Sequence, residues 1–207
     1  MKNNNTNDRP IVEAALESGE VVTDILMRGD ALAEIPVIGT AIKICKAADA
    51  FRDRAFAIKL SKFVQHLEDI TEEQKDKLKE KMLSGEAQKV GETLFFVLEH
   101  VTDLDKPSLL SQIFLAYIDG VVTGEELRRL SRAVDMAFAD DLKQLLKAEV
   151  VQDRSYEPWM RYLVPSGLTQ LVGSGALGSA GTLYCEITPL GKKLISAYSY
   201  GKSTISH

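Results

Sequence analysis

Two stretches of this chain contain residue types whose spacing could do chemistry. The first, Gly173 to Gly178, reads GSGALG and matches the G-x-G-x-x-G string of dinucleotide-binding proteins. In those proteins the glycines of the string let the backbone approach a pyrophosphate at the start of a helix. That use requires a helix opening within the string and an acidic residue about 20 positions later. A strand pattern follows instead, and no acid lies at that distance, so the string predicts a hairpin loop.

The second stretch holds Glu99, His100, Asp103 and Asp105, which could be metal ligands. Glu99 and Asp103 are one helical turn apart, and His100 and Asp103 also share a face. It offers only one imidazole, however, and acidic residues at helix ends are common surface features. The other histidines, His66 and His207, are scattered, and the cysteines, Cys45 and Cys185, have no metal or redox spacing. We therefore predict no catalytic residue, no metal, no cofactor and no small-molecule substrate.

Composition favours an ordinary globular protein. The chain has 207 residues, 45% hydrophobic and 27% charged, with a net charge of −5. That negative balance disfavours nucleic acid as a partner, because neutralising phosphates needs a basic surface. The start is polar without an apolar leader segment, and no run of about 18 uncharged apolar residues follows. We expect a cytoplasmic protein, with peripheral contact to the inner membrane left open.

The longest helical pattern runs from Ile35 to Leu67 and predicts a central helix. Its apolar residues share one broad arc that includes Phe56, Ile58, Leu60 and Phe63, while Ala57 and Ser61 fall on the opposite side. Three polar residues, Asp49, Arg52 and Lys59, lie inside the apolar arc.

Asp49 and Arg52 are three residues apart, so they can pair on one face of this helix. A satisfied, partly buried pair would fix the packing register of neighbouring helices. The alternative is an interaction or switch site comprising Asp49, Arg52 and Arg54, with the cations near anionic lipid headgroups.

Capping signals place further helices along the chain. Thr71 with Gln74, and Thr123 with Glu126, have the form of capping boxes at helix starts. Charged residues 72–83 predict a solvated helix that ends at Gly85. Further helices are predicted at residues 87–101, 107–118 and 123–138. Asp140 and Asp141 favour the start of one more helix. We expect residues 1–9 to be a disordered tail and residues 10–122 a helical domain.

After residue 150 the pattern changes to a short helix around residues 157–164, two strands, 168–172 and 183–187, and a last helix that Thr188 and Pro189 begin. This order is that of a winged helix. The predicted fold is mainly α, a multi-helix domain around one long central helix, with a C-terminal winged-helix-like module (123–200) that contains a two-stranded β hairpin, and a tail (201–207).

Winged helices often read DNA with a recognition helix and a wing. Here the predicted recognition helix offers Arg161 as its one cation, and residues 173–181 of the wing contain no Lys or Arg. Lys192 and Lys193, in the last helix, are the other candidates for phosphate contact. The sequence favours a protein-contact or structural role for this module over DNA binding.

Three strings carry a resemblance to a known family. They are IPVIGTAIKICKAADAFRDRAFAIKLSKF, LVPSGLTQLV and YCEITPLGKKLI. Together these strings resemble the abortive-infection alpha (Abi-alpha) type and related bacterial domains of unknown function. The matching positions are Pro36, Val37, Gly39, Arg52, Arg54, Gly167, Leu168 and 184–191. The resemblance implies a non-enzymatic role in phage defence or superinfection exclusion and supplies no catalytic residues.

We therefore predict a non-enzymatic interaction or effector protein of bacterial anti-phage defence, acting through protein or membrane contact. Its partners would be another protein or a second copy of itself. The alternative is a winged-helix regulator that binds DNA.

Overall fold

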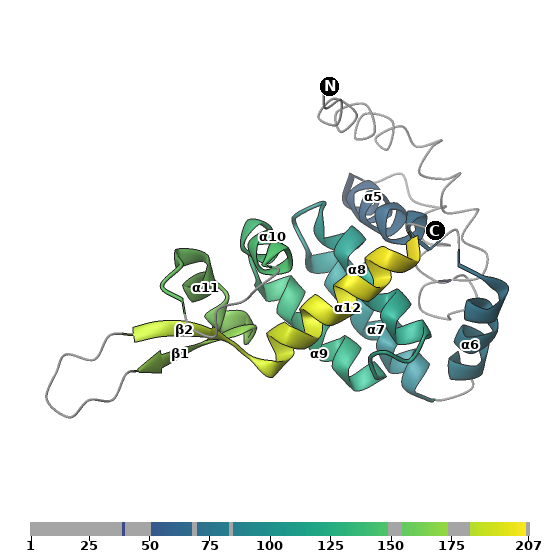
Figure 1. Ribbon diagram of the computed structural model, residues 1–207. Coiled ribbons are helices and arrows are strands. Elements are labelled where there is room, and N and C mark those ends of the chain that lie inside the picture. Colours follow the sequence, from purple (N-terminus) through teal and green to yellow (C-terminus); the bar gives the residue numbers. More distant parts are fainter. Residues whose placement is uncertain are drawn as a thin grey trace, which may run out of the picture. The chain divides into compact units, whose positions relative to one another are not determined.

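The computed structural model describes residues 39, 51–67, 70–82, 85–148, 155–173 and 183–205 (coloured in Figure 1). The chain forms two compact units, residues 1–99 and 100–207. The predicted fold class is confirmed, since the described residues are mainly helical with one small antiparallel hairpin before the last helix. The predictions for residues 1–38 and 40–50 lie outside the described residues.

The first unit contains α5 (Phe51–Gln65), α6 (Glu72–Met82) and α7 (Gly85–His100). The second contains α8 (Lys106–Ile118), α9 (Gly124–Met136), α10 (Ala139–Lys147), α11 (Pro158–Tyr162), the short 3₁₀ helix η1 (Val164–Ser166), β1 (Thr169–Gly173), β2 (Leu183–Ile187) and α12 (Pro189–Ile205).

Helices α5 and α7 share the core of the first unit. Phe56 of α5 meets Phe95 of α7 edge to face, with 5.2 Å between ring centroids. Apolar residues of both helices are almost fully buried: Leu60, Phe63 and Val64 in α5, and Val90, Leu94, Val97 and Leu98 in α7. The side chain of Lys59 is also buried, and its Nζ donates a hydrogen bond to the backbone oxygen of Glu99 at 2.6 Å.

The apolar arc predicted for the long helix is correct in α5 for Leu60 and Phe63 but wrong for two small residues. Ala57 and Ser61, expected on the polar side, are buried, whereas Phe56 and Ile58 are only partly buried. Ser61 tolerates burial because its hydroxyl donates to the backbone oxygen of Ile58 at 2.8 Å.

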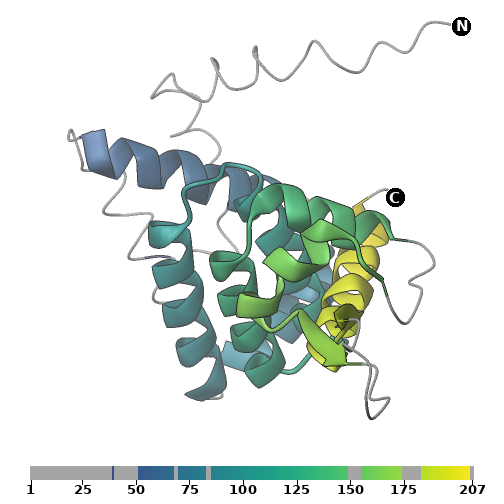
Figure 2. The ribbon, with the colours of Figure 1, turned by 90° about the vertical axis from the view of Figure 1, so that its left-hand side faces the viewer.

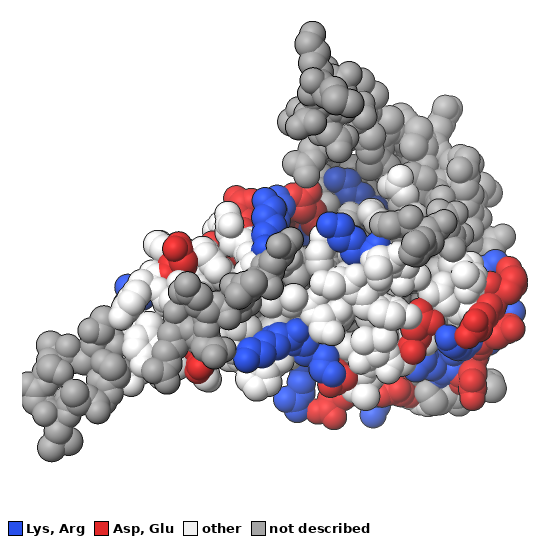
Figure 3. Space-filling view, in the orientation of Figure 1, with Lys and Arg blue, Asp and Glu red and all other residues white. Residues whose placement is uncertain are grey.

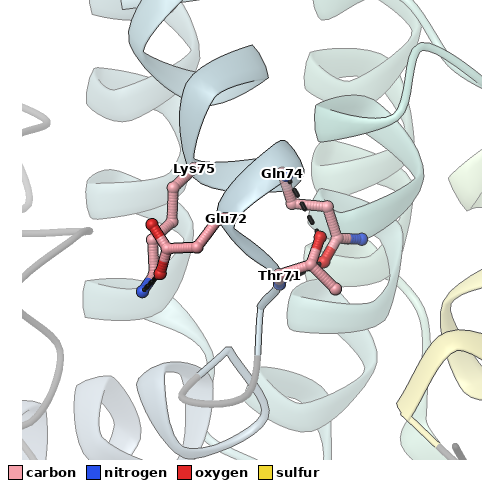
Figure 4. A network of polar contacts seen from close by, with 4 residues as sticks. All are labelled: Thr71, Glu72, Gln74 and Lys75. Carbon is pink, nitrogen blue, oxygen red and sulfur yellow. Dashed lines mark hydrogen bonds and ion pairs between the residues drawn. The ribbon is translucent and has the colours of Figure 1, made fainter.

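The capping box at the start of α6 is confirmed (Figure 4). The backbone N–H of Gln74 donates to Thr71 Oγ1 at 3.2 Å, and the N–H of Thr71 donates to Gln74 Oε1 at 3.0 Å. Lys75 and Glu72 pair on the exposed side of the same turn, 2.6 Å apart. Helix α6 ends at Met82, before Gly85 as predicted, and Gly85 is the first residue of α7.

Helix α8 is the centre of the second unit. Its residues are buried on nearly every side, among them Leu110, Ile113, Phe114, Tyr117 and Ile118. Helix α12 packs chiefly against α8, and α9 packs on it as well (Figures 1 and 2). The second unit therefore begins before α8, whereas α8 was predicted to belong to the helical domain of residues 10–122.

The predicted tail at residues 201–207 is wrong for residues 201–205, which continue α12. Gly201 is buried, and a Cβ atom at this position would collide with the backbone of Gln112 in α8. The missing side chain therefore allows the end of α12 to lie directly on α8.

Candidate functional site

The winged-helix-like part of the second unit comprises α11, η1 and the hairpin. The predicted recognition helix (157–164) is shorter than expected: α11 has five residues. Pro165 disfavours an α conformation for the residue before it, and the chain continues as η1. Gly167, with φ of 75°, then turns the chain into β1.

One hydrogen bond joins α11 to the hairpin. The buried hydroxyl of Thr169, the first residue of β1, donates to the backbone oxygen of Met160 at 2.5 Å. Met160 and Leu163 are buried beneath the hairpin together with Leu168 and Ile187. These contacts fix the position of α11 relative to the hairpin.

The junction of β2 and α12 is equally well defined. The hydroxyl of Thr188 donates to Gly167 O at 2.6 Å and accepts from the N–H of Gly191 at 3.1 Å, which confirms the predicted cap. A Cβ at Gly191 would collide with the backbone of Leu168 and the side chain of Ile187. The helix therefore starts in direct contact with the root of the hairpin.

The hairpin strands pair antiparallel, with Leu171 opposite Cys185 and Gly173 opposite Leu183. On its other edge β2 meets Ser155, which exchanges two backbone hydrogen bonds with Cys185. Next to this bridge, Tyr156 lies edge to face against Tyr184, with 6.1 Å between centroids.

Several large apolar side chains of this region are exposed. Tyr156 and Tyr162 are 65% and 66% exposed, and Leu171 and Leu183 are each 50% exposed. Since Leu171 pairs with Cys185, and Leu183 with Gly173, both leucines lie on one face of the sheet, the face that holds buried Cys185 and Ile187. We call these two leucines the apolar hairpin face. In Figure 3 the described atoms at the hairpin end are mainly uncharged.

The apolar hairpin face was not predicted from the sequence. Strand alternation places Leu171 and Leu183 on the same face as core residues, so the pattern alone indicates burial. Thr169, which bonds to α11, and Ile187 are buried at the root of the hairpin, whereas Leu171 and Leu183 are half exposed.

The three cations proposed for nucleic-acid contact have different surroundings. Arg161 of α11 and Lys192 of α12 are exposed. Lys193 forms an ion pair with Glu126 of α9, with 3.0 Å between Nζ and Oε1. Arg129 of α9 pairs with Glu125 of the same helix, four residues earlier, at 2.7 Å.

Cys185 is a buried free thiol. Burial raises the pKa of this thiol, and the positive charge of Arg161 opposes the shift. A thiol held protonated is a poor nucleophile, so its environment is that of a core residue. Cys45 lies outside the described residues.

The candidate interaction or switch residues of the long helix are Asp49, Arg52 and Arg54. Asp49 lies outside the described residues, and so do the side chains of Arg52 and Arg54, whose backbone belongs to α5. Their pairing and lipid contact stay predictions.

Two of the acids considered as metal ligands have other partners. Asp103 accepts a hydrogen bond from the N–H of Asp105 at 2.8 Å, and Asp105 pairs with Lys143 of α10 at 2.5 Å. Among the described residues, no group of three or more His, Cys, Asp or Glu is arranged to hold a metal ion. No helix in the described ranges is both long and apolar enough to span a membrane.

Comparisons with protein-family models, with curated proteins and with solved structures gave no significant match for this chain.

Proposed function

We propose that this chain is a non-enzymatic contact protein of bacterial anti-phage defence, and that its winged-helix-like part binds protein. The apolar hairpin face carries this proposal. Leu171 and Leu183 are half exposed on the element that inserts into a DNA groove in DNA-reading winged helices. Exposed apolar side chains that share a face favour a protein partner over DNA, because binding to DNA phosphates needs cationic side chains.

The defence role rests on the sequence resemblance to Abi-alpha type domains. Its test is a phage challenge of bacteria that express the chain. We expect fewer plaques with the wild type, and we expect the double variant L171S/L183S to lose that protection. The matched control is Gln170→Ser, which changes an exposed polar residue on the opposite face of β1.

The two parts of this proposal fail separately. A wild type without protection against a panel of phages contradicts the defence role. Protection that survives in L171S/L183S, at the same protein level, contradicts the role of the apolar hairpin face.

DNA binding is the alternative, and exposed Arg161 and Lys192 are the observation that favours it. A winged-helix regulator would retard duplex DNA, and its affinity would fall steeply as salt rises because phosphate contacts release counterions. We expect no such salt-sensitive binding from the wild type. Binding that weakens in R161A and K192A would replace the protein-contact role by the regulator.

Membrane contact is tested with vesicles that contain anionic lipid. We expect the wild type to remain in the supernatant after sedimentation. Co-sedimentation that Arg52→Ala abolishes would support the lipid-contact role considered for α5 and would contradict the protein-contact proposal.

A further inference from the structure

β1 is the edge strand of the hairpin sheet. The order across the sheet is the Ser155 bridge, then β2, then β1. Strand β2 therefore has a partner on each side, whereas β1 pairs with β2 alone among the described residues. An edge strand presents backbone donors and acceptors to whatever strand approaches it.

The hydrogen-bond pattern identifies which backbone groups point outward. Cys185 exchanges its backbone hydrogen bonds with Ser155, at 2.8 and 3.0 Å, so they point away from β1. Its partner across the hairpin, Leu171, is thus in a non-hydrogen-bonded pair, because the two pair types alternate in an antiparallel ladder. The N–H and C=O of Leu171 therefore point to the open edge, while Val172 bonds to Tyr184.

Strand β1 lacks two of the features that usually prevent strand pairing. The sequence of β1 is TQLVG, with no charged residue and no proline. Leu171 and Leu183 are diagonal neighbours on one face, each 50% exposed. A chain with a net charge of −5 thus presents an uncharged, apolar strand edge.

We propose that two copies of this chain pair through β1, antiparallel and centred on Leu171. A two-fold axis at Leu171 makes the contact self-complementary. Leu171 exchanges both outward hydrogen bonds with Leu171 of the second copy, and Thr169 lies opposite Gly173. Identical edges without charge meet without repulsion, and the two apolar hairpin faces become one continuous leucine surface.

The occupant is a second copy because the edge is complementary to itself. Gly173 has no side chain to hinder the residue opposite it, and no like charges face each other across the axis. The contact is small, so we expect a weak dimer that forms as the concentration rises. This inference rests on the proposed protein-contact role and names its partner.

The first test is sedimentation of the full chain over a range of concentrations. We expect the wild type to dimerise, and Leu171→Lys to lower the association constant by about tenfold or more, because two lysines then meet at the axis. Gln170→Lys is the matched control. This substitution adds the same charge, but next to Glu186. In the dimer residue 170 faces Val172 of the other copy, so the two added lysines do not face each other. We therefore expect the Q170K protein to dimerise.

The second test is amide hydrogen exchange. The N–H of Leu171 should exchange fast in dilute wild type and become protected as the concentration rises, whereas the N–H of Val172 is protected throughout. Circular dichroism shows whether L171K is folded. Since Leu171 is half exposed, we expect its spectrum to match the wild type.

A wild type that stays monomeric up to about 1 mM overturns the inference. So does a dimer that L171K leaves intact, or one whose formation leaves the Leu171 amide unprotected. If L171S/L183S loses phage protection while the wild type is monomeric, the apolar hairpin face binds another protein and the proposed function survives. If the dimer forms without phage protection, only the defence role fails.

Discussion

The ammonium group of Lys106 donates a hydrogen bond to the backbone oxygen of Asp135, with 2.9 Å between Nζ and O. Asp135 is the penultimate residue of α9, and Lys106 is the first of α8. Lys59 forms the same contact with Glu99, the penultimate residue of α7. The last carbonyls of a helix lack intrahelical donors and carry its negative dipole end. In each unit a buried lysine therefore caps the C-terminus of another helix.

Replacing Lys106 with methionine should destabilise the second unit. The substitution keeps an apolar side chain but leaves the Asp135 carbonyl without its donor, which costs about 1–3 kcal/mol. Trp159, the one tryptophan of the chain, lies in this unit, so its fluorescence reports the urea-induced unfolding. The control, Lys147→Met, alters an exposed lysine in the last turn of α10 and should unfold as the wild type does. Equal midpoints for K106M and wild type would contradict the capping role.

Stability should also depend on pH through Lys106. Burial lowers the pKa of its ammonium group below the ordinary 10.5, while Asp135 and Asp103 oppose the shift. Between the folded-state pKa and 10.5 the unfolded chain binds more protons, so the free energy of unfolding rises with pH in this window. We expect the wild type to gain stability relative to K106M as pH approaches 10.5, measured by urea unfolding. A difference that stays constant or shrinks would show that the folded-state pKa is not lowered.

Gly201→Ala should separate α12 from α8. The added methyl collides with the backbone of Gln112, which cannot move aside as a flexible side chain does, and overpacking of this kind costs about 1–3 kcal/mol. Gly85→Ala is the matched control, because a Cβ at Gly85 meets nothing within 4 Å. We expect G85A to be neutral or more stable by up to about 1 kcal/mol. Thermal unfolding followed by circular dichroism compares the two variants, and equal effects would refute the close contact.

Glu126 should contribute to stability at neutral but not at low pH. The backbone N–H of Thr123 and then the ammonium of Lys193 lower the pKa of the Glu126 carboxyl from its ordinary 4.5. Its contribution is therefore present above 4.5 and lost as pH falls through the lower folded-state pKa. Relative to Glu126→Gln, the wild type should lose stability in that acid window.

The Lys193 contact is exposed, so Lys193→Met should cost only about 0.2–1 kcal/mol at neutral pH. Lys192→Met, one residue earlier on the exposed side of α12, should cost nothing measurable. If K192M destabilises as much as K193M, the ion pair is not the cause.

Signals confined to a few neighbouring residues were predictable from the sequence. The capping boxes at Thr71 and Thr123, the helix end before Gly120 and the start of α12 at Thr188 each depend on groups within four residues. Both strands were also predicted to within one residue, because β propensity and a glycine-rich connection suffice to mark a hairpin.

Features that depend on distant partners were not predictable. Lys106 and Asp135 are separated by 29 residues, and nothing around either residue indicates the other. The central position of α8, by contrast, could have been predicted. Its sequence, PSLLSQIFLAYI, is apolar around most of the helix circumference, which is typical of a fully enclosed helix.

The pairing of α8 with α12 has a consequence for synthesis. The first helix of this unit is covered chiefly by the last one, so the part of its apolar surface that α12 covers has no neighbour there until residues 189–205 have left the ribosome. Contacts this distant in sequence make folding slow, because the whole intervening chain must be ordered first. During translation the α12-facing side of α8 therefore stays exposed until the end of this unit has been made.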